Sequence, residues 1–304
     1  IPDNGRLTQQ ILIPTKAKGS VEVGQIVTVE ITDYPTRQLG AKGRIAEVLG
    51  EHLDPGMEID VAIRSHGIPW EWPDEVLHEA AGLEAEPLEE DKQHRVDLRQ
   101  LPFVTIDGED ARDFDDAVYC EEGSGGNWRL WVAIADVSHY VWPDSALDQE
   151  ASLRGNSVYF PARVVPMLPE ALSNGLCSLK PDVDRLAMVC EMELTAAGVL
   201  AKYRFYESII HSHARLTYTQ VGEVLEQGSH ADVDSQRVPD LKRLHSLYRV
   251  LRAARDKRGA IDFETVETRI IFDEHRKIEA IEPVVRNDAH KLIEECMLCA
   301  NVAT

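Results

Sequence analysis

The stretch that most constrains this chain is residues 105–116, TIDGEDARDFDD, in which six of the twelve residues are acidic. A predicted strand, LPFVTID, ends inside this stretch, and another, AVYCEE, begins directly after it. Crowded carboxylates repel one another unless a positive group lies among them. Two flanking strands would hold these carboxylates together at one edge of a sheet, so the pattern favours a cation site.

The acidic stretch admits three interpretations: a metal-dependent phosphoryl-transfer site, a calcium or structural site, and a solvated loop. A calcium loop of the EF-hand type needs an oxygen ligand at its fifth position and glycine at its sixth. Counted from Asp107 these positions are Ala111 and Arg112, and counted from Asp113 the fifth is Ala117, so the EF-hand pattern fails. Magnesium binds a few carboxylates together with water and phosphate oxygens, and two ions about 4 Å apart can activate water at a phosphodiester.

At 304 residues, of which 43% are hydrophobic, the chain is long enough for two domains with real cores. In residues 1–70, apolar runs separated by glycines predict a small β-barrel of the OB type. Its expected strands cover residues 10–14, 25–35, 41–50 and 58–69. Residues 71–100 are acidic and are predicted to form a helical connector with solvated faces, and residues 101–304 form the larger unit.

The larger unit is predicted to mix strands and helices. Its expected strands cover residues 101–107, 117–122, 128–141, 185–196, 199–216, 268–274 and 277–283. Apolar spacing predicts one helix over residues 239–259 and another that begins at Asn287 or Asp288. Since this last helix is still open at residue 304, we expect the chain to be a piece of a longer protein.

The charge balance argues against one class of function. With 53 acidic and 32 basic residues the formal net charge is −21, which is a poor match for a protein that coats nucleic acid. A local basic path, bound divalent ions or further parts of the protein could still serve a nucleic-acid enzyme. No apolar run approaches eighteen residues and no signal peptide is recognisable, so we expect a cytoplasmic protein without a membrane segment.

Cysteines and histidines give weaker signals. Five scattered cysteines indicate a reducing compartment, and the pair Cys296 and Cys299 is expected to be buried on one helix face. A redox or metal role for this pair is the alternative, although no second pair completes a zinc site. His139, His211 and His213 are expected to be structural or surface residues, because nothing at metal-ligand spacing joins them.

Residues 106–117, IDGEDARDFDDA, resemble the signature of the catalytic domain of the ribonuclease II/R family, and within it the ribonuclease R branch most of all. The resemblance implies an α+β fold, in which an N-terminal OB-type, cold-shock-like β-barrel is followed by part of the mixed α/β RNB catalytic domain. It also implies that a first cold-shock domain, the rest of the catalytic domain with its arginine, and an S1 domain lie outside these 304 residues.

By the same resemblance, four aspartates would be catalytic and would hold magnesium, with manganese as the alternative ion: Asp107, Asp113, Asp115 and Asp116. Asp107 and Asp116 would bind one ion, and Asp113 would contribute to the second. Asp115 would orient the attacking water or complete that second site. The expected reaction is processive, non-specific hydrolysis of RNA from its single-stranded 3′ end to nucleoside 5′-monophosphates.

The resemblance also assigns RNA contacts. Tyr159 matches an aromatic that stacks on the base nearest the 3′ end, and Tyr218 matches one associated with preference for RNA over DNA. Phe263 matches a second base-clamping aromatic. Glu294, rather than Glu295, is aligned with a glutamate of the catalytic pocket, and we expect one of these two neighbours to be solvated.

The family further implies partners in RNA degradation or at the ribosome, and we expect a monomer. Two alternatives from other functional classes remain. The first is a catalytically silent RNA-binding regulator on the same fold, against which the intact aspartate spacing argues. The second is a phosphodiesterase of small nucleotides, for which the N-terminal barrel would have no evident use.

Overall fold

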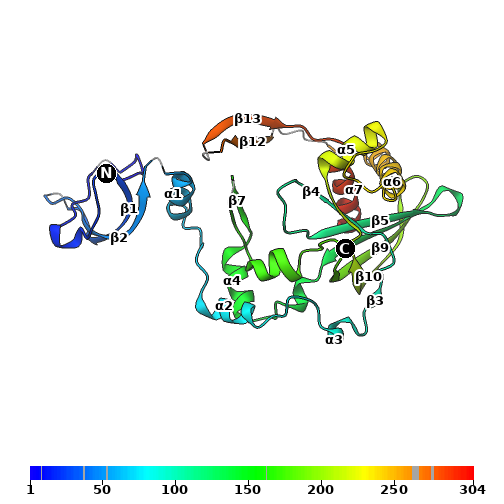
Figure 1. Ribbon diagram of the computed structural model, residues 1–304, viewed down its shortest axis with the longest axis horizontal. Helices are drawn as coiled ribbons and strands as arrows, with labels where there is room; N and C mark the ends of the chain where they lie inside the picture. Colours follow the sequence, from blue (N-terminus) through cyan, green and yellow to red (C-terminus); the bar gives the residue numbers. More distant parts are fainter. Residues whose placement is uncertain (8, 37, 53, 162, 262–266, 275–276) are drawn as a thin grey trace. The chain divides into compact units, whose positions relative to one another are not determined.

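The computed structural model describes residues 1–304 apart from 8, 37, 53, 162, 262–266 and 275–276. The chain divides into two compact units (Figure 1). The smaller unit consists of Ile1–Trp70 and Arg269–Glu282, and the larger unit consists of Glu71–Thr268 and Pro283–Thr304.

An antiparallel pair of strands forms one sheet of the smaller unit. Strand β1 covers Gln25–Asp33 and strand β2 covers Lys42–Glu51, which confirms both strands predicted there. The two backbones approach closely at Gly43, where an added Cβ would lie 2.5 Å from a methyl carbon of Val29. A 3-10 turn at Thr15–Ala17 precedes this pair in the chain.

Two other strands predicted for this unit differ from the structure. Residues 10–14 contribute a single parallel bridge, from Leu12 to Lys42. The strand predicted at 58–69 is wrong, because helix α1 occupies Met57–Ser65. Short apolar runs fit the period of a strand and that of a buried helix equally well, so periodicity alone could not separate them.

Contacts made by Arg64 favour the helix. Its guanidinium donates to both carboxylate oxygens of Glu47 on β2, at 2.8 and 2.5 Å, and lies 3.4 Å from Asp60 one turn earlier in the helix. The same group lies over the Trp70 ring, 4.9 Å from its centre. In a helix Asp60 and Arg64 are neighbours on one face, whereas in a strand residues four apart share a face but lie about 13 Å from each other.

A mixed sheet of seven strands organises the larger unit, in the order β11-β4-β5-β6-β9-β10-β3. Its central strands are antiparallel, whereas β11 runs parallel to β4 and β10 runs parallel to β3. The strands are β3 (Val96–Asp97), β4 (Val104–Asp107), β5 (Asp116–Glu122), β6 (Trp128–Ala135), β9 (Asp184–Leu194), β10 (Leu200–His211) and β11 (Ala214–Thr217). The strands predicted between residues 101 and 216 are present, with the last one divided into β10 and β11. The strand predicted at 128–141 is too long, because β6 ends at Ala135 and a 3-10 turn occupies Val137–His139.

Each face of this sheet carries its own core, because successive side chains of a strand point to opposite sides. Leu130 and Val132 of β6 lie in the first core, and Trp131 and Ala133 lie in the second. The helices that pack on the first core are α5 (Tyr218–Gln227), α6 (Val238–Lys257) and α7 (Asp288–Ala303) (Figure 1). The helices that pack on the second core are α2 (Asp74–Ala81) and α4 (Ala146–Arg154).

Shorter elements complete the chain. They are α3 (Glu89–Lys92), the 3-10 turns Ser124–Gly126 and Val137–His139, the hairpin of β7 (Val158–Phe160) and β8 (Arg163–Val165), and a π-helical turn at Leu172–Leu176. A further two-stranded sheet pairs β12 (Glu267–Phe272) with β13 (Ile278–Val284), which confirms the strands predicted at 268–274 and 277–283.

The first turn of α7 follows the predicted capping. The side-chain oxygen of Asn287 accepts hydrogen bonds from the backbone N–H groups of Ala289, at 3.0 Å, and His290, at 3.4 Å. Such a cap satisfies backbone donors that have no partner within the helix. Farther along α7, Cys296 is buried, Cys299 is partly buried, and both are free thiols, which agrees with a packing role.

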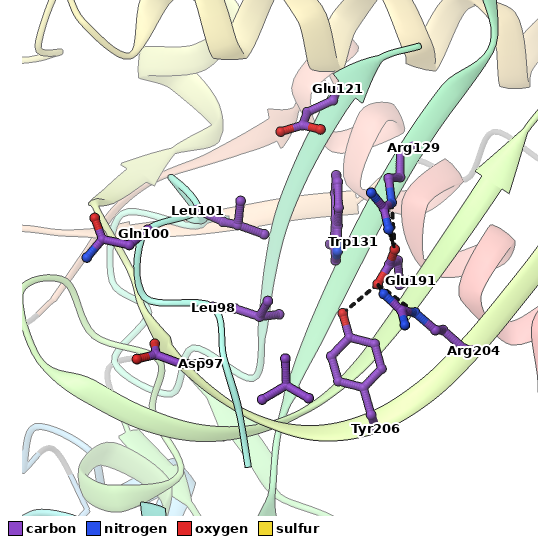
Figure 2. Close-up of a pocket in the computed structure, with 11 residues that line it drawn as sticks. Asp97, Leu98, Gln100, Leu101, Glu121, Arg129, Trp131, Glu191, Arg204 and Tyr206 are labelled. Atoms are coloured by element: carbon purple, nitrogen blue, oxygen red, sulfur yellow. Dashed lines mark hydrogen bonds and ion pairs between the residues drawn. The ribbon is translucent and has the colours of Figure 1, made fainter. Parts of the chain in front are cut away.

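A pocket of about 320 Å³ lies against the second face of the sheet (Figure 2). It is lined by residues 96–98, 100 and 101 and by side chains of β5, β6, β9 and β10. Glu191 of β9 is buried in its lining, and Arg129, Arg204 and Tyr206 point toward it. Arg204 Nη2 donates at 2.6 Å, the Tyr206 hydroxyl at 2.8 Å and Arg129 Nε at 2.5 Å. Burial alone would raise the pKa of Glu191, but these donors hold it below its usual value, so the carboxylate is ionised.

Replacing Glu191 with alanine should lower the free energy of unfolding by about 1–3 kcal/mol, because several donors lose their shared acceptor. Urea unfolding followed by circular dichroism measures this loss. Glu193→Ala is the matched control, since its half-exposed carboxylate pairs with Lys202 at 3.4 Å and should contribute less than about 1 kcal/mol. Equal losses in the two variants would contradict the importance of the buried cluster.

Candidate functional site

Two neighbouring strands bring the acidic stretch to one edge of the sheet. Strand β4 ends at Asp107 and β5 begins at Asp116. The two strands are antiparallel partners that meet at Val104 and Val118. Because the end of one antiparallel strand lies beside the start of the next, the loop 108–115 returns to the edge that it left.

The loop has a defined backbone because two distant residues bind its carbonyl and N–H groups. Ser178 is buried, and its hydroxyl donates to the carbonyl of Arg112 at 2.8 Å and accepts from the N–H of Phe114 at 3.1 Å. Arg215 of β11 donates to the carbonyl of Glu109 at 2.6 Å. Ser178 and Arg215 therefore both hold the loop. A solvated surface loop would not need such contacts.

Four carboxylates of this edge, here called the aspartate tetrad, interact electrostatically: Asp107, Asp113, Asp115 and Asp116. Burial, followed by the charges of Asp107 and Asp115, raises the pKa of Asp116 to about 6. Asp115 is exposed as a residue, but the chain around its carboxyl removes water there, and together with the charges of Asp113 and Asp107 this raises its pKa to about 6. The tetrad thus concentrates negative charge at one place, and the nearby Arg215 offsets only part of its effect on Asp107.

Asp107 and Asp116 differ in their hydrogen bonds. Asp107 accepts one from the N–H of Gly108 at 2.7 Å, which opposes the increase in its pKa that burial causes. In contrast, Oδ2 of Asp116 is buried and has no hydrogen-bond partner among the residues that the structure describes. A buried carboxylate oxygen without a partner is costly, so this atom is a natural ligand for a cation.

The donor chemistry of the tetrad fits magnesium better than a dedicated calcium cage. In the described part of the chain, no group of three or more His, Cys, Asp or Glu side chains is gathered closely enough to hold one ion. Calcium in proteins takes six to eight oxygen ligands, whereas magnesium is often held by one or two carboxylates together with water and substrate phosphate. Oxygen ligands that are spread over one edge suit the second pattern.

Tyr159 lies next to the tetrad, which is the position expected of a residue that stacks on a base there. Its side chain is 64% exposed at the end of the β7 and β8 hairpin, and its hydroxyl donates to Oδ2 of Asp113 at 2.5 Å. Burial of the hydroxyl and this hydrogen bond raise the pKa of Tyr159 to about 12. The residue therefore presents an open aromatic face beside the carboxylates.

Tyr218 lies near Asp107 and Asp116, two other members of the tetrad. It is the first residue of α5, directly after Thr217, which pairs with Asp107 across β11 and β4. Burial, and then the charges of Asp107 and Asp116, raise the pKa of Tyr218 to about 12. Its ring stacks on His290 with the ring centres 3.9 Å apart.

Glu294 and Glu295 share an arginine partner. Arg255 Nη1 donates to both carboxylates at 2.9 Å, and Arg286 also pairs with Glu294. Glu295 is buried, whereas the Glu294 side chain is 32% exposed, so one of the two neighbours does keep access to solvent. The choice of Glu294 rather than Glu295 as the pocket residue stays a prediction. Phe263 lies outside the described residues.

The three histidines named from the sequence make other contacts. His139 lies 3.2 Å from a carboxylate oxygen of Asp91, and His211 lies 3.3 Å from Asp184. The ring of His213 bonds to the carbonyl of Arg99 at 3.1 Å. These contacts agree with structural roles.

Sequence comparison identifies the domain that carries this edge. Residues 95–304, which contain the whole tetrad, match the RNB domain. The chain belongs to the RNB family. Residues 1–73 match a cold shock domain, so the predicted order of a cold-shock-like domain followed by RNB sequence is confirmed.

Curated relatives match this chain over its whole length. It is 62% identical to ribonuclease R of Vibrio cholerae and 57% identical to ribonuclease R of Escherichia coli, over 100% of its own length in each case. The solved structure of Mycoplasma genitalium RNase R in complex with double-stranded RNA is 34% identical, with a TM-score of 0.91 over 97% of this chain and 53% of that one. The chain spans 37% of the length of the two curated relatives.

Sequence reasoning missed three residues that organise the RNB edge: Ser178, Arg215 and His290. Each acts on a residue more than sixty positions away in the chain, so no local pattern could have found them. Arg215 does stand three residues before Tyr218, but nothing in that spacing indicates that it binds the acidic loop. Among the described residues, no helix combines the length and apolar character needed to cross a membrane.

Proposed function

We propose that the protein to which this chain belongs is a magnesium-dependent 3′→5′ exoribonuclease that hydrolyses RNA processively to nucleoside 5′-monophosphates. The observation that carries the proposal is the aspartate tetrad, held at one sheet edge of an RNB domain. Within the described part of the chain, a buried oxygen of Asp116 has no hydrogen-bond partner. High identity to proteins named ribonuclease R supports it.

The side chains of the tetrad have separate parts in this proposal. When bound, magnesium supplies Lewis-acid activation of water and stabilisation of the leaving oxygen. Asp107 and Asp116 would hold one ion, and Asp113 would contribute to a second. Asp115 is the exposed member, and its raised pKa suits a carboxylate that accepts a hydrogen bond, and then a proton, from the attacking water.

Two aromatic residues beside the tetrad would place the RNA. Tyr159 offers an exposed ring on which the base nearest the 3′ end can stack, and such stacking tolerates any base. Tyr218 would meet the sugar of the terminal nucleotide. Phe263 is proposed as a second stacking residue and Glu294 as a pocket residue, both on the basis of family resemblance.

The remaining proposals concern the whole protein. Its substrate would be the single-stranded 3′ end of RNA, its metal magnesium with manganese as the alternative, and its location the cytoplasm. We propose a monomer with partners in RNA degradation or at the ribosome. Domain limits of 1–70, 71–100 and 101–304 are proposed for the cold-shock-like domain, the acidic connector and the RNB region.

RNA labelled at its 5′ end separates the proposal from its rivals. With magnesium, the full-length protein should shorten this RNA from the 3′ end and release mononucleotides, and EDTA should stop the reaction. RNA binding without any cleavage would favour the silent regulator instead. Faster cleavage of a dinucleotide than of long RNA would favour the small-nucleotide phosphodiesterase.

A second measurement tests processivity. An excess of unlabelled RNA is added after the reaction has started, so that an enzyme that leaves its substrate cannot return to it. A processive enzyme should finish the labelled strands that it already holds. Accumulation of intermediate lengths under these conditions would contradict this part of the proposal.

A further inference from the structure

The ring of Tyr218 has a partner on another helix. His290 of α7 stacks on it with a ring-centre distance of 3.9 Å and an angle of 15° between the ring planes. One face of the tyrosine ring is therefore covered. The stack fixes the tilt of the ring, because two flat rings in contact at this distance cannot rotate independently.

Asn287 ties both residues to the start of α7. Its side-chain amide donates to the carbonyl of Tyr218 at 2.8 Å. Nδ1 of His290 lies 3.2 Å from the backbone N of Asn287 and 2.9 Å from its Oδ1, so either neutral tautomer of the ring finds a partner there. The backbone and the ring of Tyr218 are thus anchored by one turn of helix.

Close packing leaves this anchor little freedom. A Cβ added at Gly222 of α5 would lie 2.4 Å from the amide nitrogen of Asn287. Real Cβ atoms are not found at such distances, so α5 approaches Asn287 as closely as a residue without a side chain allows. The position of Tyr218 relative to Asp107 therefore depends on α7 as well as on β11.

We propose that His290 is a positioning residue for Tyr218 and, through it, a determinant of selection for RNA over DNA. The inference rests on the proposed function, in which Tyr218 meets the sugar of the 3′-terminal nucleotide. A ring held at one tilt can distinguish a sugar with a 2′-hydroxyl from one without it. A ring that is free to tilt accommodates both sugars, so loss of the stack relaxes the selection.

Three variants of the full-length protein separate the stack from the helix cap. His290→Gln keeps a side-chain acceptor at the third position of the helix but removes the flat ring, whereas His290→Phe keeps the ring and removes the acceptor. His245→Gln is the matched control, because His245 stacks on Tyr248 and lies 2.9 Å from Asp288 at the start of the same helix, without contact to Tyr218.

The measured quantity is the ratio of kcat/KM for an RNA oligonucleotide to that for the same sequence with deoxyribose at its last residues. His290→Gln should lower this ratio about five-fold or more, while His290→Phe and His245→Gln stay within about two-fold of the wild type. Adding His290→Gln to Tyr218→Ala should not lower the ratio further, since both changes act through the ring of Tyr218.

Dissociation constants of both oligonucleotides, measured in EDTA, give a readout that needs no catalysis. If the wild-type protein binds RNA but does not cleave it, the proposed function fails while the binding ratio still tests His290. An unchanged ratio in His290→Gln overturns the inference, as does equal loss in His290→Gln and His290→Phe, which would assign the effect to the cap. Equal dissociation constants of the wild-type protein for the two oligonucleotides also overturn it.

Discussion

Replacing Asp115 with asparagine is expected to lower RNA turnover about 10²- to 10⁴-fold while RNA binding stays within about two-fold of the wild type. Asparagine has nearly the same shape as aspartate but cannot accept a proton from water at neutral pH. The backbone carbonyl of Asp115 accepts from the N–H of Ala135 at 2.9 Å, and this contact does not depend on the side chain. The loop should therefore keep its conformation.

Single-turnover cleavage of a 5′-labelled RNA and a separate binding titration give the two quantities for the full-length protein. Asp110→Asn is the matched control, because Asp110 is an exposed carboxylate of the same loop that lies outside the tetrad. It should change turnover less than about three-fold if only general surface charge is affected. Retained turnover in Asp115→Asn would remove Asp115 from the catalytic group.

Without metal, the protein is expected to lose stability as the pH rises from about 4 to 7. Burial and the charges of Asp107 and Asp115 raise the pKa of Asp116 from 3.8 to about 6 in the folded chain. The folded state thus binds this proton more tightly than the unfolded state, and the advantage disappears once the pH exceeds the folded pKa. A shift of this size corresponds to about 3 kcal/mol.

Thermal unfolding in EDTA at pH 5 and at pH 7.5 measures this effect. At pH 5, one unit below the folded pKa, about 1.4 kcal/mol of this stability remains, and almost none remains at pH 7.5. One kcal/mol changes Tm by about 2–4 °C in a domain of this size, so we expect a decrease of about 3–6 °C. Magnesium binds the ionised carboxylates and should restore most of this loss at pH 7.5. Asp116→Asn should reduce both the pH dependence and the response to magnesium, whereas Asp110→Asn should retain both.

If Tm in EDTA does not change between pH 5 and pH 7.5, the raised pKa of Asp116 is contradicted. A Tm that falls with pH but does not respond to magnesium would support the repulsion between the carboxylates and contradict the magnesium site. The carboxylates would then repel one another in the folded chain without forming a magnesium site. Titration with manganese in the same assay tests the alternative ion.

Local patterns in the sequence predicted much of the fold. The apolar strands around residues 105–116, the long helix before Gly259 and the N-cap at Asn287 depend on neighbours within one or two turns or on alternation along one strand. Such patterns are independent of the rest of the chain, and the structure contains each of these elements. Helix α1 shows the limit, because its short apolar run fits two periods and Glu47 of β2 supplies an anchor for Arg64.

For the tetrad itself, the sequence alone determined which carboxylates exist and that two strands hold them at one edge. Only the tertiary structure decided how the loop is held, through Ser178 and Arg215, and which member keeps a buried oxygen without a partner. It also decided that Glu294 and Glu295 share Arg255 and that His290 supports Tyr218. These contacts join residues far apart in the chain, and their geometry depends on how whole helices pack on the sheet.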